Sequence, residues 1–250
     1  MATPTLTRPD IPVTPSPGVP AHRPEAPAGP PKLDRDALRR AWNETLDAPR
    51  MKYSLLAKMM FVPVDLVYGR KGSYTKFAML EIIARVPYQA WERTGYWALH
   101  RHHGRSALAR RVFDRIVEAR ADQDNEQWHL LIMQDLVQRT GAKQSRVLHK
   151  ALPWLIAFFY YHVSWLLFVL RPEWSYRLNA EFEDHAEHEY MTFVAEHPEL
   201  EDEPDPGTYA AEYGRYASVA DLLRQIGHDE RMHKQDSLVH IRAPRFHQAP

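Results

Sequence analysis

The chain has 250 residues, 44% of them apolar, which is enough for one domain with a sizeable core. Its 32 basic and 32 acidic residues cancel, and no basic stripe with interleaved aromatic residues occurs, so we expect no nucleic-acid partner. The absence of cysteine excludes disulfides, thiolate metal sites and cysteine nucleophiles, so any metal must be bound by Glu, Asp and His, which suits iron or manganese.

Residues 1–33 contain half of the 20 prolines and scarcely any large apolar residue. We therefore expect a disordered extension there, followed by a single helical domain over residues 34–243. The extension lacks the apolar stretch of a signal peptide, and its prolines would break the amphipathic helix of a mitochondrial presequence. Because no other targeting signal is recognised in the sequence, the expected location is the cytoplasmic face of a bacterial inner membrane.

From residue 34 onward, apolar residues recur with a helical period, and strand-like alternation bounded by tight turns is absent. This pattern predicts an all-α fold. The first helix is expected to start after an N-cap at Asp34, to break or kink near Pro63 and to close at Gly69. The second is expected over residues 74–100, with a bend at Pro87.

Four further helices are predicted after this point. Proline at the first turn and a capping box, formed by Ser218 with Asp221, mark two of their starts. The third to sixth helices are expected at residues 106–141, 145–170, 172–197 and 219–239. An acidic, proline-rich loop connects the last two.

The motif Glu-x-x-His occurs twice, as Glu126 with His129 and as Glu230 with His233. Positions three apart lie on one face of a helix, so both side chains can reach one point. A buried carboxylate beside an imidazole costs free energy unless something pairs with both, and a metal ion is one such partner. A single pair of this kind is more often a salt bridge or cap at the surface, so the order of the motifs matters more than either one.

Each motif follows a helix that carries a glutamate among apolar residues, Glu81 before the first and Glu183 before the second. The order Glu, Glu-x-x-His, Glu, Glu-x-x-His on four helices is that of ferritin-like four-helix bundles with two metal ions. Four carboxylates would neutralise two divalent ions, and two imidazoles would complete the ligands. We therefore predict a ferritin-like bundle with a two-metal carboxylate site, with Glu81, Glu126, His129, Glu183, Glu230 and His233 as ligands.

Other polar residues on these helices have weaker claims. Tyr190 lies two turns beyond Glu183 and points the same way. His185 and His188 lie off that stripe, so we expect them at the surface or behind the ligands. The histidines of the "HRHH" stretch sit at a helix end, where cations offset the helix dipole, and no ligand role is expected for them.

Residues 151–170 form a stretch of twenty residues without a formal charge. By length it could cross a bilayer. A single crossing, however, would put Glu126 and Glu183 on opposite sides of the membrane and prevent the site from assembling. The segment is then either core, a dimer interface, or bound in one leaflet, and its many aromatic residues favour one leaflet. The first helix is expected to join it, which gives two membrane-surface helices.

Five segments, in order over residues 64–233, resemble the alternative oxidases, in particular the plastid and cyanobacterial terminal oxidases: "VDLVYGRKG", "LEIIARVPYQA", "NEQWHLLIMQDL", "EFEDHAEHEY" and "DERMH". The resemblance implies a non-haem enzyme with two iron ions that oxidises quinol, reduces O2 to water, lies on one face of a membrane and is often a homodimer. By position, the six predicted ligands match the family's iron ligands. Tyr190 matches a tyrosine that supplies an electron, and Asn125 and Asp229 match residues that hold the ligands in place.

The chain departs from the family pattern around the expected quinol pocket. Lys76 stands where the family has arginine, Glu189 where it has serine or threonine, and Ile82 follows Glu81 in place of threonine. The identity of the quinol therefore does not follow from the resemblance. Two alternatives use the same ligands: a hydroxylase or desaturase acting on a lipid-soluble substrate, and a ferritin-like metal-binding protein without turnover.

Overall fold

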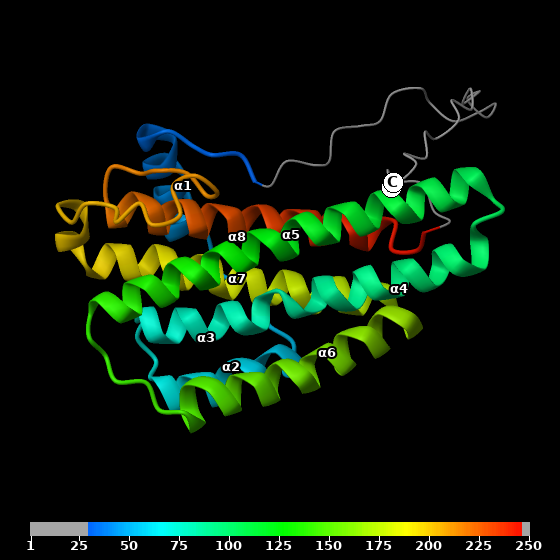
Figure 1. The fold of residues 1–250 in the computed structure, drawn as a ribbon, viewed down its shortest axis with the longest axis horizontal. Helices are drawn as coiled ribbons and strands as arrows, with labels where there is room; N and C mark the ends of the chain where they lie inside the picture. The colour runs from blue at the N-terminus through cyan, green and yellow to red at the C-terminus, as the bar shows by residue number, and fades with distance from the viewer. Residues whose placement is uncertain (1–29, 247–250) are drawn as a thin grey trace, which may run out of the picture.

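The structure is a computed structural model that describes residues 30–246, and over that part of the chain it is all-α, as predicted (Figure 1). The extension expected at residues 1–33 falls outside the described residues up to residue 29. The first helix, α1 (Arg35–Asp47), starts where expected: the Asp34 side chain accepts a hydrogen bond from the Ala37 amide.

The prediction that this first helix continues to a break near Pro63 is wrong. It ends at Asp47, because Ala48 precedes Pro49 and takes an extended conformation (φ −80°, ψ 140°). A second helix, α2 (Leu55–Tyr68), starts at an N-cap made by Ser54. Pro63 lies exposed inside α2 and does not end it.

The remaining helices follow the predicted order. The expected bend at Pro87 is a break at Arg85, between α3 (Tyr74–Ala84) and α4 (Val86–His102). A short π-helical turn, η1 (Val147–Ala151), precedes the fourth predicted helix, and a 3-10 turn, η2 (Pro198–Glu201), follows the fifth. The other long helices are α5 (Ser106–Arg139), α6 (Leu152–Leu170), α7 (Pro172–Glu196) and α8 (Val219–Arg242).

Four rods form a bundle: α3 continued by α4, then α5, α7 and α8 (Figure 1). The pair α7 and α8 makes the most extensive packing, and α5 packs against both α3 and α4. Helix α1 covers α8 and α7 on one side, whereas α6 packs on α4, α7 and α3 on the other. The bundle therefore places α3, α5, α7 and α8, which carry the predicted ligands, around one interior.

Helices α4 and α5 approach closely at Gly95. A Cβ atom at this position would lie 2.5 Å from Cγ1 of Ile116, which is itself buried. Any larger residue would require the Ile116 side chain of α5, the helix that continues to Glu126 and His129, to shift.

Helix α6 is not a core helix. Only Pro153, Tyr160, Ser164 and Phe168 of its residues are buried. Among the residues that the structure describes, Val147–Leu170 is the one helical stretch long and apolar enough to cross a membrane, and 22% of its most apolar part is buried in the protein. The core alternative for this segment is therefore excluded.

Candidate metal centre

The six predicted ligands converge in the middle of the bundle, and none is more than 1% exposed. They form two groups in which the potential ligand atoms all lie within 4.8 Å of one another. The first group is Glu81, Glu126, His129 and Glu230, and the second is Glu126, Glu183, Glu230 and His233. Because Glu126 and Glu230 belong to both groups, the arrangement is that of two adjacent sites with two shared carboxylates.

Both imidazoles present Nδ1 to the centre. Nδ1 of His129 lies 3.1 Å from Oε1 of Glu230 and 3.6 Å from oxygens of both Glu81 and Glu126. Nδ1 of His233 lies 2.8 Å from Oε1 of Glu126 and 3.9 Å from Oε2 of Glu230. The two rings are 6.3 Å apart between centroids, so each can serve a different ion.

The atoms that face the centre lie close to one another but form no hydrogen bond of acceptable angle among the described residues. This holds for both oxygens of Glu126 and of Glu230, for Oε2 of Glu81 and Glu183, and for Nδ1 of both histidines. Buried polar atoms are nearly always satisfied, and an uncompensated buried carboxylate is costly. Oxygen and imidazole donors in this number and arrangement fit a pair of divalent metal ions of the iron or manganese kind.

The pKa values of these groups reflect burial and crowding. Burial, reinforced by the charge of Glu230, raises the pKa of Glu81 well above its usual range. Burial and the charges of Glu126 and Glu230 do the same to the pKa of Glu183. Burial lowers the pKa of His233, but the carboxylates of Glu126 and Glu230 outweigh it and raise that pKa well above the ordinary value. Protons therefore partly neutralise the centre when no metal is bound.

Asp229 and Asn125 lie directly behind His129, where the resemblance implies supporting residues. Oδ2 of Asp229 is 3.3 Å from Nε2 of His129 and accepts hydrogen bonds from Asn125 Nδ2 (3.2 Å) and Tyr213 Oη (2.7 Å). Gln225 donates to the other oxygen at 2.6 Å. Burial opposes ionisation of Asp229, but His129 and the charge of Lys32 lower its pKa to about 2. An ionised Asp229 fixes a proton on Nε2, which leaves Nδ1 free to bind a metal.

Tyr88 supports Glu183 and was not predicted. Its hydroxyl donates to Oε1 of Glu183 at 2.8 Å and accepts a hydrogen bond from Asn179 at 3.0 Å. Tyr88 lies seven residues after Glu81, so the two-turn spacing that identified Tyr190 could have identified it as well.

The Tyr190 hydroxyl donates a hydrogen bond to Oε1 of Glu81, which connects α7 to α3. Its ring stacks on Phe77, with centroids 4.2 Å apart and planes at 17°. Burial, followed by the charge of Glu81, raises the pKa of Tyr190 well above its usual value. The phenol is therefore neutral, fully buried and in contact with a predicted ligand.

Lys76 and Glu189, which precede Phe77 and Tyr190 in the sequence, are brought together as an ion pair. Nζ of Lys76 lies 3.0 Å from Oε2 of Glu189 and 2.8 Å from Asp65, and Arg50 lies 3.1 Å from the other oxygen of Glu189. Lys76 is fully buried. These contacts join α2, α3 and α7 in one charged network.

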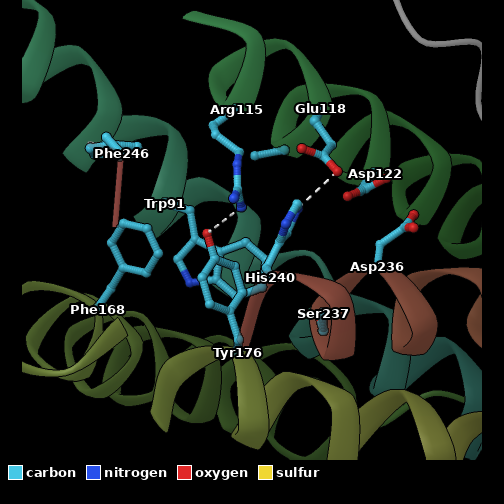
Figure 2. A pocket seen from close by; sticks show the side chains of 11 residues that line it. Trp91, Arg115, Glu118, Asp122, Phe168, Tyr176, Asp236, Ser237, His240 and Phe246 are labelled. Atoms are coloured by element: carbon cyan, nitrogen blue, oxygen red, sulfur yellow. Dashed lines mark hydrogen bonds and ion pairs between the residues drawn. The ribbon is translucent and has the colours of Figure 1, made fainter. Parts of the chain in front are cut away.

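A second acidic cluster adjoins His233 from the opposite side. Oδ1 of Asp122 is 3.9 Å from Nε2 of His233, too far for a direct hydrogen bond. Burial raises the pKa of Asp122 to about 7. Figure 2 shows Asp122 beside Glu118, Asp236 and His240 around a cavity of about 10 Å³, which is room for roughly one water molecule.

His185 and His188 are buried, so a surface role is excluded for them. His185 stacks on Phe61 of α2, with ring centroids 4.1 Å apart. His188, Asp184 and Glu187 form a third close group of possible ligand atoms, but Lys234 ion-pairs with both Asp184 and Glu187. The Lys234 ammonium therefore occupies the position in which a metal cation would bind.

Comparison with known proteins identifies a family that agrees with the carboxylate and histidine site described above. The family model described as alternative oxidase matches residues 49–240. "Ubiquinol oxidase 4, chloroplastic/chromoplastic" from Arabidopsis thaliana is 32% identical over 151 residues, which are 57% of this chain and 38% of that protein. The chain therefore matches less than half the length of this relative. The family match spans most of the chain and includes all six predicted ligands, and the chain belongs to the alternative oxidase family.

Proposed function

We propose that this protein is a quinol:oxygen oxidoreductase that reduces O2 to water at a non-haem two-iron centre on one face of a membrane. Alternative oxidases are di-iron carboxylate enzymes, and the Arabidopsis relative carries the name of a ubiquinol oxidase. The observation that carries the proposal is the pair of buried ligand groups that share Glu126 and Glu230.

In this proposal Glu81 and His129 bind one ion, and Glu183 and His233 bind the other. The shared Glu126 and Glu230 bind both. When bound, the iron pair supplies electrons to O2, which the side chains alone cannot do. Four carboxylates offset the four positive charges of two ferrous ions, and the metal-binding imidazoles are neutral, so the buried centre would carry no net charge. Manganese would suit the same donors, which makes metal analysis part of the test.

The quinol head group is proposed to bind beside Lys76 and Glu189. The Lys76 ammonium has three partners, the Arg70 carbonyl, Asp65 and Glu189, so a quinol oxygen would replace one of them, and Glu189 would accept the hydroxyl proton. Tyr190 follows Glu189 in the sequence and its hydroxyl donates to Glu81, so α7 carries a residue of the proposed quinol site next to one that contacts a predicted ligand. Each quinol gives two electrons and two protons, so two quinols supply the four electrons that convert one O2 into two water molecules. Tyr190 would lend one electron in the interval before the second quinol restores it.

A membrane surface is proposed for α2 and α6. Both helices expose large apolar side chains that water would otherwise contact. The exposed set is Leu55, Met59, Val62, Leu66, Val67, Trp154, Leu155, Phe158, Phe159, Trp165, Leu166, Val169 and Leu170. A homodimer is the other way to cover such a face.

The comparisons give no support to the bacterial inner membrane expected from the sequence, since the relative's name assigns that protein to chloroplasts and chromoplasts.

The test is oxygen uptake by the purified full chain in detergent, with ubiquinol and plastoquinol analogues and parallel iron and manganese analysis. We expect two quinols oxidised per O2 and no oxygen atom in the organic product. Labelled oxygen in that product would instead identify a hydroxylase or desaturase, and metal binding without uptake would identify a storage protein; either result overturns the proposal.

Two variants separate binding from turnover. Glu183→Ala should abolish both metal binding and uptake, whereas Tyr190→Phe should keep the metal and lose uptake. Glu196→Ala is the matched control, because Glu196 is exposed at the end of the same helix. Full metal occupancy in Glu183→Ala would contradict the ligand assignment.

A further inference from the structure

The segment before α1 packs against the outer side of the metal centre. Gln225 of α8 holds it by both ends of its amide: the Leu33 amide donates to Oε1 at 2.9 Å, and Nε2 donates to the Pro31 carbonyl at 3.1 Å. The same Gln225 side chain donates to Asp229. The backbone on both sides of Lys32 is therefore fixed to the residue that also holds Asp229.

Lys32 points inward from this fixed backbone. Its Nζ donates to Oδ2 of Asp229 at 3.2 Å and lies 3.6 Å from the centre of the Tyr213 ring. The Asp229 side chain is fully buried, whereas that of Lys32 is 41% exposed. Among the described residues, the ion pairs of Asp229 are with Lys32 and His129 alone. Lys32 is thus the fixed positive charge on the carboxylate behind His129.

Lys32 lies outside residues 49–240, the part of the chain that matches the family, whereas its partner Asp229 lies inside it. Asp229 shares one oxygen, Oδ2, between Lys32 and His129. A carboxylate behind a metal-bound imidazole pulls on its Nε2 proton and makes the ring a stronger donor to the metal. A cation on the same oxygen weakens that pull.

We propose that Lys32 is a positioning residue that acts on the metal centre through Asp229 and His129 and keeps the reduction potential of the bound iron higher than it would otherwise be. The inference rests on the proposed function in one respect, that iron binds at this site. Removal of the charge has two effects of the same sign. It takes away a positive charge, which favours the more positive oxidised iron, and it frees Asp229 to strengthen His129 as a donor.

The experiment is a redox titration of the iron-loaded full chain. Electron paramagnetic resonance of the one-electron-reduced state monitors the titration and gives the midpoint potential. Lys32→Met should lower the midpoint potential, and Lys32→Arg should restore it to the wild-type value. Lys143→Met is the control, because Lys143 is exposed in the loop after α5. A potential in Lys32→Met equal to that of Lys143→Met would overturn the proposal, as would a Lys32→Arg potential as low as that of Lys32→Met.

A second measurement needs no iron. In the metal-free protein, 15N spectra of the histidine rings should show a changed Nε2 signal for His129 in Lys32→Met and an unchanged one in Lys32→Arg. If the wild type binds no iron, the proposed function fails, yet this comparison still tests the link from Lys32 to His129. An unchanged His129 signal in Lys32→Met would show that Lys32 does not act on His129, and would overturn the inference even if the enzyme proved to be a quinol oxidase.

Discussion

The hydroxyl of Tyr88 gives the sharpest test of how the bundle holds its metal ligands. Tyr88 is 1% exposed, and its hydroxyl donates to Glu183 at 2.8 Å while accepting from Asn179 at 3.0 Å. Tyr88→Phe keeps the ring and removes only this oxygen. Glu183 then loses the hydrogen bond that orients it, and the Asn179 amide keeps only its hydrogen bond to Ser237.

Two independent magnitudes agree for this change. A hydrogen bond to a charged group contributes about 1.5–3 kcal/mol. Loss of a residue that orients a metal ligand lowers metal affinity by roughly 10- to 100-fold, or about 1.4–2.7 kcal/mol. We therefore expect Tyr88→Phe to weaken ferrous-ion binding by roughly 10- to 100-fold, mainly at the Glu183 side of the centre.

The assay is an anaerobic competition titration against a chelator of known affinity, with the fold checked by circular dichroism. Tyr160→Phe is the matched control, since Tyr160 is also buried but its hydroxyl has no hydrogen-bond partner among the described residues. Equal affinities for the two variants would refute the reasoning, because they would show that the hydrogen bond to Glu183 does not orient it.

Three further outcomes follow from the structure. Gly95→Ala should lower the melting temperature, since overpacking costs about 1–3 kcal/mol and the gain in helix propensity is at most about 1 kcal/mol; Gly104→Ala, with no atom within 4 Å of its added Cβ, should not. The hydrogen bond from Arg224 lowers the pKa of Glu201 from 4.5 to about 2, so the native state keeps this carboxylate ionised where the unfolded chain protonates it. Between pH 4.5 and 2, the free energy of unfolding should therefore fall by about 1 kcal/mol more in the wild type than in Glu201→Gln. This figure already allows for solvent screening, and urea unfolding measures it. Ferrous ion at about 100 times its Kd should stabilise the fold by about 2.7 kcal/mol, as seen in the thermal midpoint, and no shift would mean that the site does not bind it.

The parts of the site that the sequence predicts are those with a helical period. Glu126 and His129 are three residues apart on one helix, and Glu81 lies on an apolar stripe, so local spacing alone fixes their direction. The same reasoning applied two turns beyond Glu81 would have identified Tyr88. Lys32 and Tyr213 lie in segments without a helical period, and their contacts with Asp229 depend on how distant segments pack.

The error in the first helix has a similar origin. Pro63 does not end a helix, because it lies on an exposed face of α2, where a proline can be tolerated. Pro49 acts through the residue before it, because Ala48 cannot stay helical without a clash with the proline ring. A proline therefore signals a helix end only in combination with the burial and packing of its neighbours, which the sequence does not display.

The surroundings of the two histidines make the two halves of the centre unequal. His129 has an ionised carboxylate at 3.3 Å that is itself held by Lys32, Tyr213 and Asn125. His233 faces Asp122 at 3.9 Å, beyond hydrogen-bond distance, and burial raises the pKa of that carboxyl to about 7. Since a carboxylate behind an imidazole strengthens it as a donor, the ion on His129 should experience the stronger ligand. Two distinct iron signals in the Mössbauer spectrum are the expected result, and a single one would contradict this reading of the two halves.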